Sequence, residues 1–367
     1  MGFARTLFRF RPDLAQHVRS IHLGEGYEPH IESADDIALF KEAEGQLERF
    51  QNSESEEAGD ENDEDQRTPT YLSLVVGKCT NLEALCISVT WFEETNPVPF
   101  SPPYSLPRLT TLSLTHWDTE NGFGLGDAKD IFIAAPNITS LYACALVEVE
   151  PDLWLPNVTE VDLVNSVLQA DCFALLLEQL PNLEKLCYSV GDACVSYDTP
   201  AFPREIQEAI LSYTPKLKFL QLYMTDTTQF EDLGDDDMLA SLKDLGSLEV
   251  LRLDAACIIA QRSAPPRTYV TQPNGRVVEQ MPDSVEALSA ELFVQMLPAS
   301  IQELEIGSSI TDVKLFLPAF LRLSQVCRTE FPQLRYVKLL CLDRSVGREL
   351  EEPFEANGVK FETKSTY

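Results

Sequence analysis

The 367-residue sequence lacks features that several classes of protein need. No apolar run reaches the ~18 residues of a membrane-spanning helix, so we expect a soluble chain without a membrane partner. Basic residues are scarce: 28 Lys and Arg stand against 59 Asp and Glu, a formal charge of −31. Because nucleic acids and anionic membranes bind proteins through Lys and Arg, we expect no nucleic-acid partner. A basic protein stays open as a partner.

Histidine is also rare, with four residues, and the nine cysteines are scattered without a Cys-x-x-Cys pair. Zinc sites and disulfide frameworks need closely spaced Cys and His residues. We therefore expect no metal, no cofactor and no disulfides. Reduced, mostly buried thiols indicate the cytoplasm or the nucleus.

What the chain has is a recurring phrase: an apolar residue, two variable residues, an apolar residue, one variable residue and an apolar residue. Its nine copies have their first apolar positions at residues 82, 109, 138, 158, 183, 217, 248, 301 and 334. Further partial copies lie at 17–23 and 358–362. The end of each phrase alternates with period 2, which predicts a strand whose apolar side chains point into a core while the variable side chains point outward.

The phrase resembles the strand segment of the leucine-rich repeat, L-x-x-L-x-L, and the resemblance covers nearly the whole chain. It implies an α/β fold: a single leucine-rich-repeat domain over residues 1–367, forming an irregular horseshoe. Parallel strands would line its concave side, with helices and loops on the convex side. The steps between copies vary from 20 to 53 residues, so the array is uneven.

The segments between copies supply the crossovers that parallel strands need. Apolar spacing predicts helices over 171–179, 204–213, 284–297 and 312–328. Asp283 and Glu286 resemble a capping box that opens the third helix. Only 20 residues separate the third copy from the fourth, which favours an extended crossover there.

Three insertions interrupt the array. Residues 50–68 centre on a run of acids without large apolar residues, which predicts a disordered acidic loop. Residues 91–104 combine proline and aromatic residues and are expected to pack as a loop. Residues 261–283 form the third insertion. There Pro273-Asn274-Gly275 separates two apolar runs and predicts a β-hairpin.

The opening LFRFRPDLAQHVRSIHL, with repeats of the PNLEKL and PRLTTLSL type, resembles the region downstream of the F-box in fungal F-box and leucine-rich-repeat proteins. In that family the array is the substrate receptor of a cullin-type ubiquitin ligase. We expect the F-box, which docks the ligase adaptor, to be missing, because residues 1–11 leave no room for it. The resemblance thus implies a protein-binding array, with adaptor binding left in doubt.

The outward positions of the nine strands form the predicted binding face. They carry three basic and five acidic side chains, so most of the negative charge lies elsewhere. Aromatic and Arg residues are the types that most often anchor interfaces. The candidate protein-binding residues are Tyr142, Glu160, Asp162, Lys185, Phe219, Gln221, Tyr223, Arg252, Asp254, Glu305, Tyr336 and Lys338.

Other clusters fail as catalytic or metal sites. Asp235 to Asp237 lack the spacing of a calcium loop and are expected to cap a helix beginning at Met238. The alternating glycines of 121–126 lack a phosphate-loop pattern and predict a flexible connection. His116 lies near Asp118, but no Ser or Cys occupies a nucleophile elbow.

These observations predict a non-enzymatic protein-binding scaffold. Two alternatives stay open: a ubiquitin-ligase substrate receptor with a missing F-box, and an acidic chaperone for basic proteins. The second is motivated by the acidic run of residues 54–65.

Overall fold

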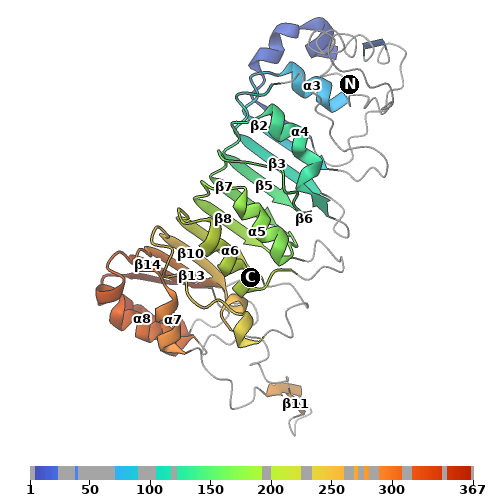
Figure 1. The fold of residues 1–367 in the computed structure, drawn as a ribbon. Helices are drawn as coiled ribbons and strands as arrows, with labels where there is room; N and C mark the ends of the chain where they lie inside the picture. Colours follow the sequence, from blue (N-terminus) through green and yellow to red (C-terminus); the bar gives the residue numbers. More distant parts are fainter. Residues whose placement is uncertain are drawn as a thin grey trace. The chain divides into compact units, whose positions relative to one another are not determined.

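The computed structural model describes most of the chain and assigns it to the α/β class. The described residues are 5–23, 38–39, 71–89, 105–116, 122–191, 200–224, 234–259, 268–271, 277–280, 289–307, 316–340 and 345–364. Eleven strands form a sheet in the order β1-β2-β3-β5-β7-β8-β9-β10-β13-β14-β15, shown in Figure 1. Segments 50–68 and 91–104 lie outside the described residues.

The chain divides into two compact units, residues 1–163 with 193–196, and residues 164–192 with 197–367. The first unit holds strands β1 Ser20–Leu23, β2 Ala84–Val89, β3 Thr111–His116, β5 Ser140–Cys144 and most of β7 Glu160–Val164. Strands β1, β2, β3 and β5 pair parallel in that order. The helices of this unit are η1 Thr6–Phe10, η2 Pro12–His17, α3 Tyr71–Lys78, η3 Leu125–Ala128 and α4 Lys129–Ala134.

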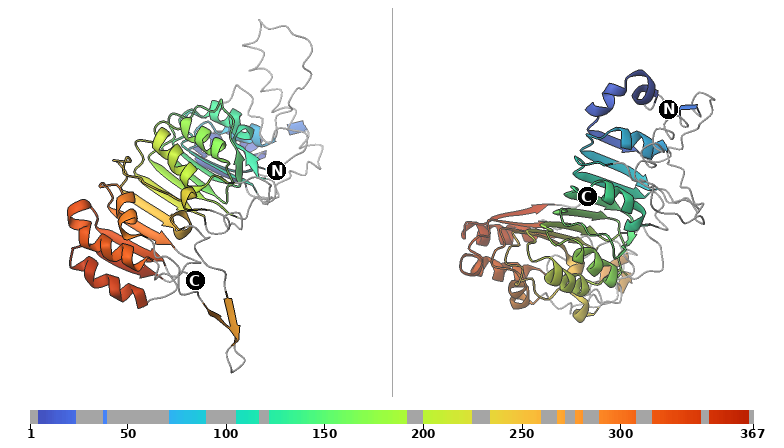
Figure 2. Two further views of the ribbon diagram at one scale, coloured as in Figure 1. Left: turned by 60° about the horizontal axis from the view of Figure 1, so that its bottom comes forward. Right: turned by 45° about the horizontal axis from the view of Figure 1, so that its top comes forward.

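The second unit holds β8 Lys185–Ser189, β9 Phe219–Tyr223, β10 Val250–Asp254, β13 Glu303–Gly307, β14 Tyr336–Leu340 and β15 Lys360–Lys364, all paired parallel. Its α-helices are α5 Ala170–Glu178, α6 Pro203–Tyr213, α7 Ala290–Met296, α8 Leu317–Glu330 and α9 Ser345–Glu355. Short 3-10 helices are η5 Asp235–Asp237 and η6 Ala255–Cys257. Helix α5 packs on α6, and α8 packs on α7 and α9. These α-helices gather on one side of the unit's strands (Figure 2).

The repeated phrase accounts for the strands. Nine strands of the large sheet, from β2 to β14, correspond to the nine copies. Each strand begins at the first residue of its copy that was predicted to point outward, for example Ala84 in β2 and Phe219 in β9. The apolar positions of the phrase are buried: Leu82, Leu85 and Ile87 are each at most 1% exposed. Burying such a side chain contributes roughly 1.5–3 kcal/mol, so the phrase supplies the core of every strand.

A recurring set of hydrogen bonds joins one copy to the next. Before β3, the backbone N–H groups of Thr110 and Thr111 both donate to the Glu83 carbonyl oxygen, at 3.0 and 3.1 Å. The same pair of bonds recurs before β2, β5, β7, β9, β10, β13 and β14, whereas before β15 only the Lys360 N–H donates to the preceding copy, at the Arg335 carbonyl oxygen. Side chains add to it: Nδ2 of Asn137 donates to the carbonyl oxygen of Pro107 at 2.9 Å, and Asn157 repeats this bond one copy later. These bonds set the register of neighbouring copies.

The partial copies at both ends are strands, as expected. Residues 20–23 form β1, which pairs with β2, and residues 360–364 form β15, which pairs with β14. The prediction of an extended crossover is also confirmed. Residues 145–159, all described, contain the short strand β6 Leu146–Glu148 and no helix.

The helices predicted over 171–179, 204–213 and 312–328 form as α5, α6 and α8, whereas the helix starts predicted at 284 and at Met238 are wrong. Helix α7 begins at Ala290 rather than at 284, because the Ser289 side chain accepts a hydrogen bond from the Leu292 N–H and caps it there. Residues 281–288, with the expected capping box, lie outside the described residues.

The helix expected from Met238 does not form. Its backbone donates outward: the Leu239 N–H bonds to the Cys257 carbonyl oxygen, and Oε1 of Gln207 accepts from Ala240 and Ser241. These partners replace the i−4 bonds of a helix. The Oδ2 of Asp237 instead accepts from the Gly234 N–H, at 2.8 Å.

The glycine-rich connection, expected to be flexible, forms regular structure where it is described. Phe123 and Gly124 form β4, which pairs with β6, and Phe123 is buried. Gly122 has φ +65°, and a Cβ there would lie 2.4 Å from a Val147 methyl carbon, so glycine is needed at this turn.

In the segment predicted to be a hairpin, strands β11 Thr268–Thr271 and β12 Val277–Gln280 pair antiparallel. The turn between them, with Pro273, Asn274 and Gly275, lies outside the described residues. The two strands form a sheet of their own, separate from the eleven-stranded one.

Candidate functional site

The strands of the second unit place a lattice of side chains on the sheet face that the helices leave open. We call this the second strand face. Its eighteen residues are Lys185, Cys187, Ser189, Phe219, Gln221, Tyr223, Val250, Arg252, Asp254, Glu303, Glu305, Gly307, Tyr336, Lys338, Leu340, Lys360, Glu362 and Lys364. The parallel register aligns them in rows across the strands: Phe219, Val250, Glu303 and Tyr336 share one row, and Gln221, Arg252, Glu305 and Lys338 share the next.

Glu305 lies at the centre of the second row and is 8% exposed. Its Oε2 accepts a hydrogen bond from Nζ of Lys338 at 3.0 Å and lies 3.8 Å from Nε of Arg252. Its Oε1 accepts from the Tyr223 hydroxyl at 3.4 Å. A buried carboxylate is costly unless it is paired, and here three side chains from three strands compensate it. Glu305 therefore holds its neighbours in place rather than offering a free charge.

Two cationic side chains lie over the Phe219 ring. The guanidinium carbon of Arg252 lies 5.0 Å from the ring centroid, and Nζ of Lys185 lies 5.8 Å from it. Both distances fall within the ~6 Å range of cation–π attraction, which contributes about 0.5–1 kcal/mol at exposed sites. Three neighbouring strands, β8, β9 and β10, thus combine into one aromatic and basic cluster.

A second aromatic cluster lies at the C-terminal edge. The Tyr336 hydroxyl donates to Oε2 of Glu362 at 2.7 Å, while Nζ of Lys360 lies 5.4 Å from the Tyr336 ring centroid and also pairs with Glu362. Lys360, Glu362 and Lys364 were absent from the predicted site. The alternating Val359 and Phe361 of the partial copy at 358–362 were the signal that could have included them.

Two tyrosines of this face have shifted pKa values. Burial, followed by the nearby Glu305 carboxylate, raises the pKa of Tyr223 to about 12. Burial and the hydrogen bond to Glu362 raise the pKa of Tyr336 to about 12. Both hydroxyls are therefore protonated donors at neutral pH. As donors they bond to the carboxylates of Glu305 and Glu362.

The structure brings nine of the twelve predicted residues together on the second strand face: Lys185, Phe219, Gln221, Tyr223, Arg252, Asp254, Glu305, Tyr336 and Lys338. Asp254 is nearly buried there, and its Oδ1 accepts from the Ala256 N–H. Tyr142, Glu160 and Asp162 belong to strands β5 and β7 of the first unit. The outward positions of that unit's β2 and β3 are small and uncharged, such as Ser113, so they add no basic or aromatic side chain to its face.

Comparison with known proteins places the chain in no family. No protein-family model matches the sequence, and no curated protein is significantly similar to it. The function must therefore be argued from the site itself.

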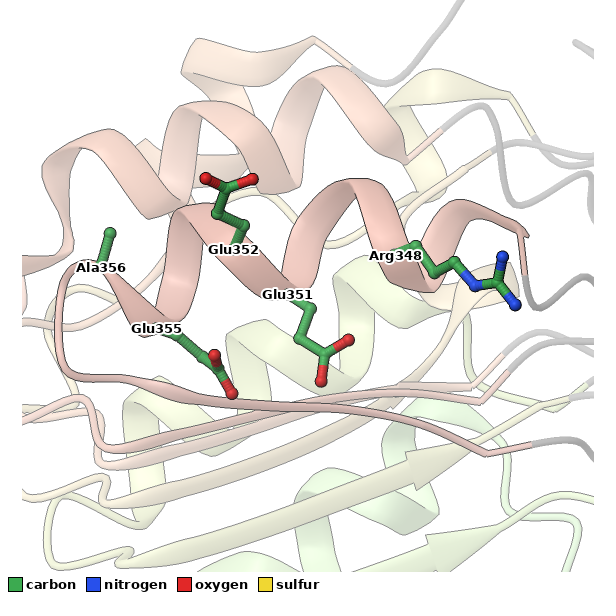
Figure 3. A pocket seen from close by; sticks show the side chains of 5 residues that line it. All are labelled: Arg348, Glu351, Glu352, Glu355 and Ala356. Carbon is green, nitrogen blue, oxygen red and sulfur yellow. The ribbon is translucent and has the colours of Figure 1, made fainter.

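Other polar clusters on the described residues are weaker. Arg348, Glu351, Glu352, Glu355 and Ala356 line a hollow of about 390 Å³ along α9 (Figure 3). Glu351 and Glu355 leave the helix on one side and Glu352 on the other, so the three carboxylates do not converge. No described group of three or more His, Cys, Asp or Glu residues is arranged to hold a metal ion.

His116, considered with Asp118 as part of a triad, is buried at the end of β3 and stacks on Phe123 with ring centroids 6.4 Å apart. Asp118 lies outside the described residues. No helix of the described chain is long and apolar enough to cross a bilayer.

Proposed function

We propose that this protein is a non-enzymatic scaffold of the leucine-rich-repeat type, whose parallel strands bind a protein partner through their outward side chains. The observation that carries the proposal is the second strand face: aromatic, basic and acidic side chains are fixed in rows on a rigid sheet. Aromatic residues and Arg are enriched at the centres of protein interfaces. A face held by its own hydrogen bonds also loses little side-chain freedom on binding.

The repeat interpretation is supported by the periodic joints between strands. Nine copies of the phrase begin nine strands of the large sheet, and the same pair of backbone bonds links successive copies within each unit. Stacked supersecondary units with nearest-neighbour contacts are the hallmark of solenoid proteins. A single repeat domain over 1–367 and a horseshoe shape are parts of this proposal. So is a location in the cytoplasm or nucleus, which would keep the scattered cysteines reduced.

The first alternative is a substrate-recognition subunit of a cullin-type ubiquitin ligase, which rests on the sequence resemblance alone. Binding of the purified chain to the ligase adaptor, measured by calorimetry, tests it. Adaptor binding would favour this role, and its absence would favour a free-standing scaffold.

The second alternative is an acidic chaperone for basic proteins. The second strand face carries five basic and four acidic side chains, a net charge of +1, which leaves −32 for the rest of the chain. Basic proteins would therefore contact other surfaces. Deleting residues 54–65 should abolish salt-sensitive binding of histones if this alternative is correct.

Affinity capture with matched variants tests the leading proposal. Tyr223→Ala and Arg252→Ala change the strand face, whereas Tyr213→Ala and Arg322→Ala change helices α6 and α8 of the same unit. The two arginines are matched in exposure, because the side chains of Arg252 and Arg322 are 38% and 36% exposed. We expect specific partners to be lost with the first two variants and kept with the controls. Partners that survive both face variants would contradict the proposed binding face.

A further inference from the structure

The guanidinium of Arg252 is the prominent unsatisfied donor of the second strand face. Its recorded contacts are the Phe219 ring and, through Nε, a 3.8 Å approach to Glu305. Among the described residues, Arg252 donates no hydrogen bond, and its ion pair with Glu305 is no shorter than 3.8 Å. A guanidinium presents its donors in a planar fork that matches a carboxylate, and the ring beneath holds that plane in place.

The carboxylates on the strand face around Arg252 are already engaged. Glu305 accepts a hydrogen bond from Lys338 at 3.0 Å and lies 3.8 Å from Nε of Arg252, and the nearly buried Asp254 accepts from the Ala256 N–H. Lys185 adds a second cation on the Phe219 ring. An anionic group beside the guanidinium would thus meet hydrogen-bond donors, whereas a cationic group there would meet like charges.

We propose that the second strand face binds an acidic segment of a protein in extended conformation, with one of its carboxylates bound by the guanidinium fork of Arg252. This inference rests on the proposed binding function and specifies its partner. It runs against the −31 charge of the chain, so recognition depends on short-range contacts, since charges beyond about 8–10 Å are largely screened at physiological salt.

The second aromatic cluster gives the spacing. Phe219 and Tyr336 lie in one row, separated by strands β10 and β13, which is three strand intervals or about 14 Å at ~4.8 Å each. Lys360, whose side chain is 67% exposed, marks the Tyr336 cluster. An extended chain advances ~3.4 Å per residue, so about four residues bridge the two clusters. The favoured segment has two acidic residues about four positions apart.

Selection of random 12-residue peptides displayed on phage, against the immobilised full-length protein, tests the inference. We expect enrichment of Asp and Glu pairs about four positions apart. Synthetic versions of the selected peptides are then titrated by fluorescence anisotropy against wild type and variants. Arg252→Gln should weaken binding about tenfold, the loss expected for one charged hydrogen-bonding group. Arg252→Lys, which keeps the charge but not the fork, should lose less.

Two controls separate this inference from the binding function itself. Arg322→Gln removes an equally exposed guanidinium from α8 and should leave affinity unchanged. Gln221→Trp fills the centre of the strand face without changing its charge, and it should block every face-bound peptide. Circular dichroism and thermal melting confirm that each variant is folded.

The outcomes are distinct. Acidic peptides blocked by Gln221→Trp and weakened by Arg252→Gln support the inference. Peptides blocked by Gln221→Trp that lack acidic residues, or that ignore Arg252→Gln, overturn the inference and leave the binding function standing. Selection of no peptide, or only of peptides indifferent to Gln221→Trp, overturns both.

Discussion

The Tyr223 hydroxyl on β9 donates to Oε1 of Glu305 on β13, two strands away, at 3.4 Å. The side chain lies across β10 to make this bond. Gly307 adjoins it: a Cβ at that position would lie 4.0 Å from Cε1 of the ring. The bond joins β9 to β13 across the intervening β10, in addition to the backbone hydrogen bonds between neighbouring strands. Residues that the sequence places 82 positions apart thus form one polar unit.

The Glu305 pairing predicts a stability effect. In Glu305→Ala, Lys338 would lose its carboxylate partner while its side chain stays 19% exposed. We expect the free energy of unfolding to fall by about 1–3 kcal/mol, below the value for a fully buried pair because Arg252 and Lys338 retain some solvent. Urea denaturation measures this.

Glu303→Ala on the same strand is the matched control. Its partner Arg335 has a side chain 67% exposed, so the expected change is within about 0.5 kcal/mol. Equal effects of the two substitutions would show that Glu305 holds no central position.

The raised pKa of Tyr223 predicts alkaline behaviour. The hydroxyl is neutral in the folded and unfolded chains below about pH 10, so its contribution to stability is fully present there. Above that pH the unfolded chain loses the proton first. The contribution is then lost as pH rises to the folded pKa of about 12. We expect Tyr223→Phe to remove one late ionisation from the absorbance titration at 295 nm. Removal of an ionisation near pH 10 instead would contradict the burial of this hydroxyl.

The asparagine bonds between copies predict a smaller effect. Nδ2 of Asn137 donates to the preceding copy at Pro107. Asn137→Ala should lower the free energy of unfolding by about 0.5–1.5 kcal/mol, the net contribution of one hydrogen bond. Asn157→Ala should act alike, since its bond to Pro136 repeats the geometry. Unchanged urea midpoints in both variants would mean that these bonds do not couple the copies.

The strands could be predicted from sequence because the phrase states their inward pattern directly. Leu217, Leu220 and Leu222 lie on the buried side of one copy, and β9 begins where that alternation does. A period-2 pattern with one buried face fixes the register, since a slip of one residue would expose the leucines.

Helix starts and polar pairings were less accessible, because they depend on distant partners. Residues 238–245 read as helical, yet Gln207 and Cys257 take their N–H groups. The order of strands β9, β10 and β13 follows the copies of the phrase, but the phrase does not encode that the Tyr223 side chain reaches past β10 to Glu305. The contribution of β15 was missed because its copy of the phrase is incomplete.

The central claim is that a partner binds the second strand face, and site-specific photo-crosslinking tests it most directly. A benzophenone amino acid replaces the exposed Lys364 on β15, at the edge of the second strand face, or, in a control, the exposed Ser212 on α6. After irradiation with the captured partner or a selected peptide, we expect crosslinks from position 364 and none from position 212. Crosslinks from position 212 alone would contradict the account.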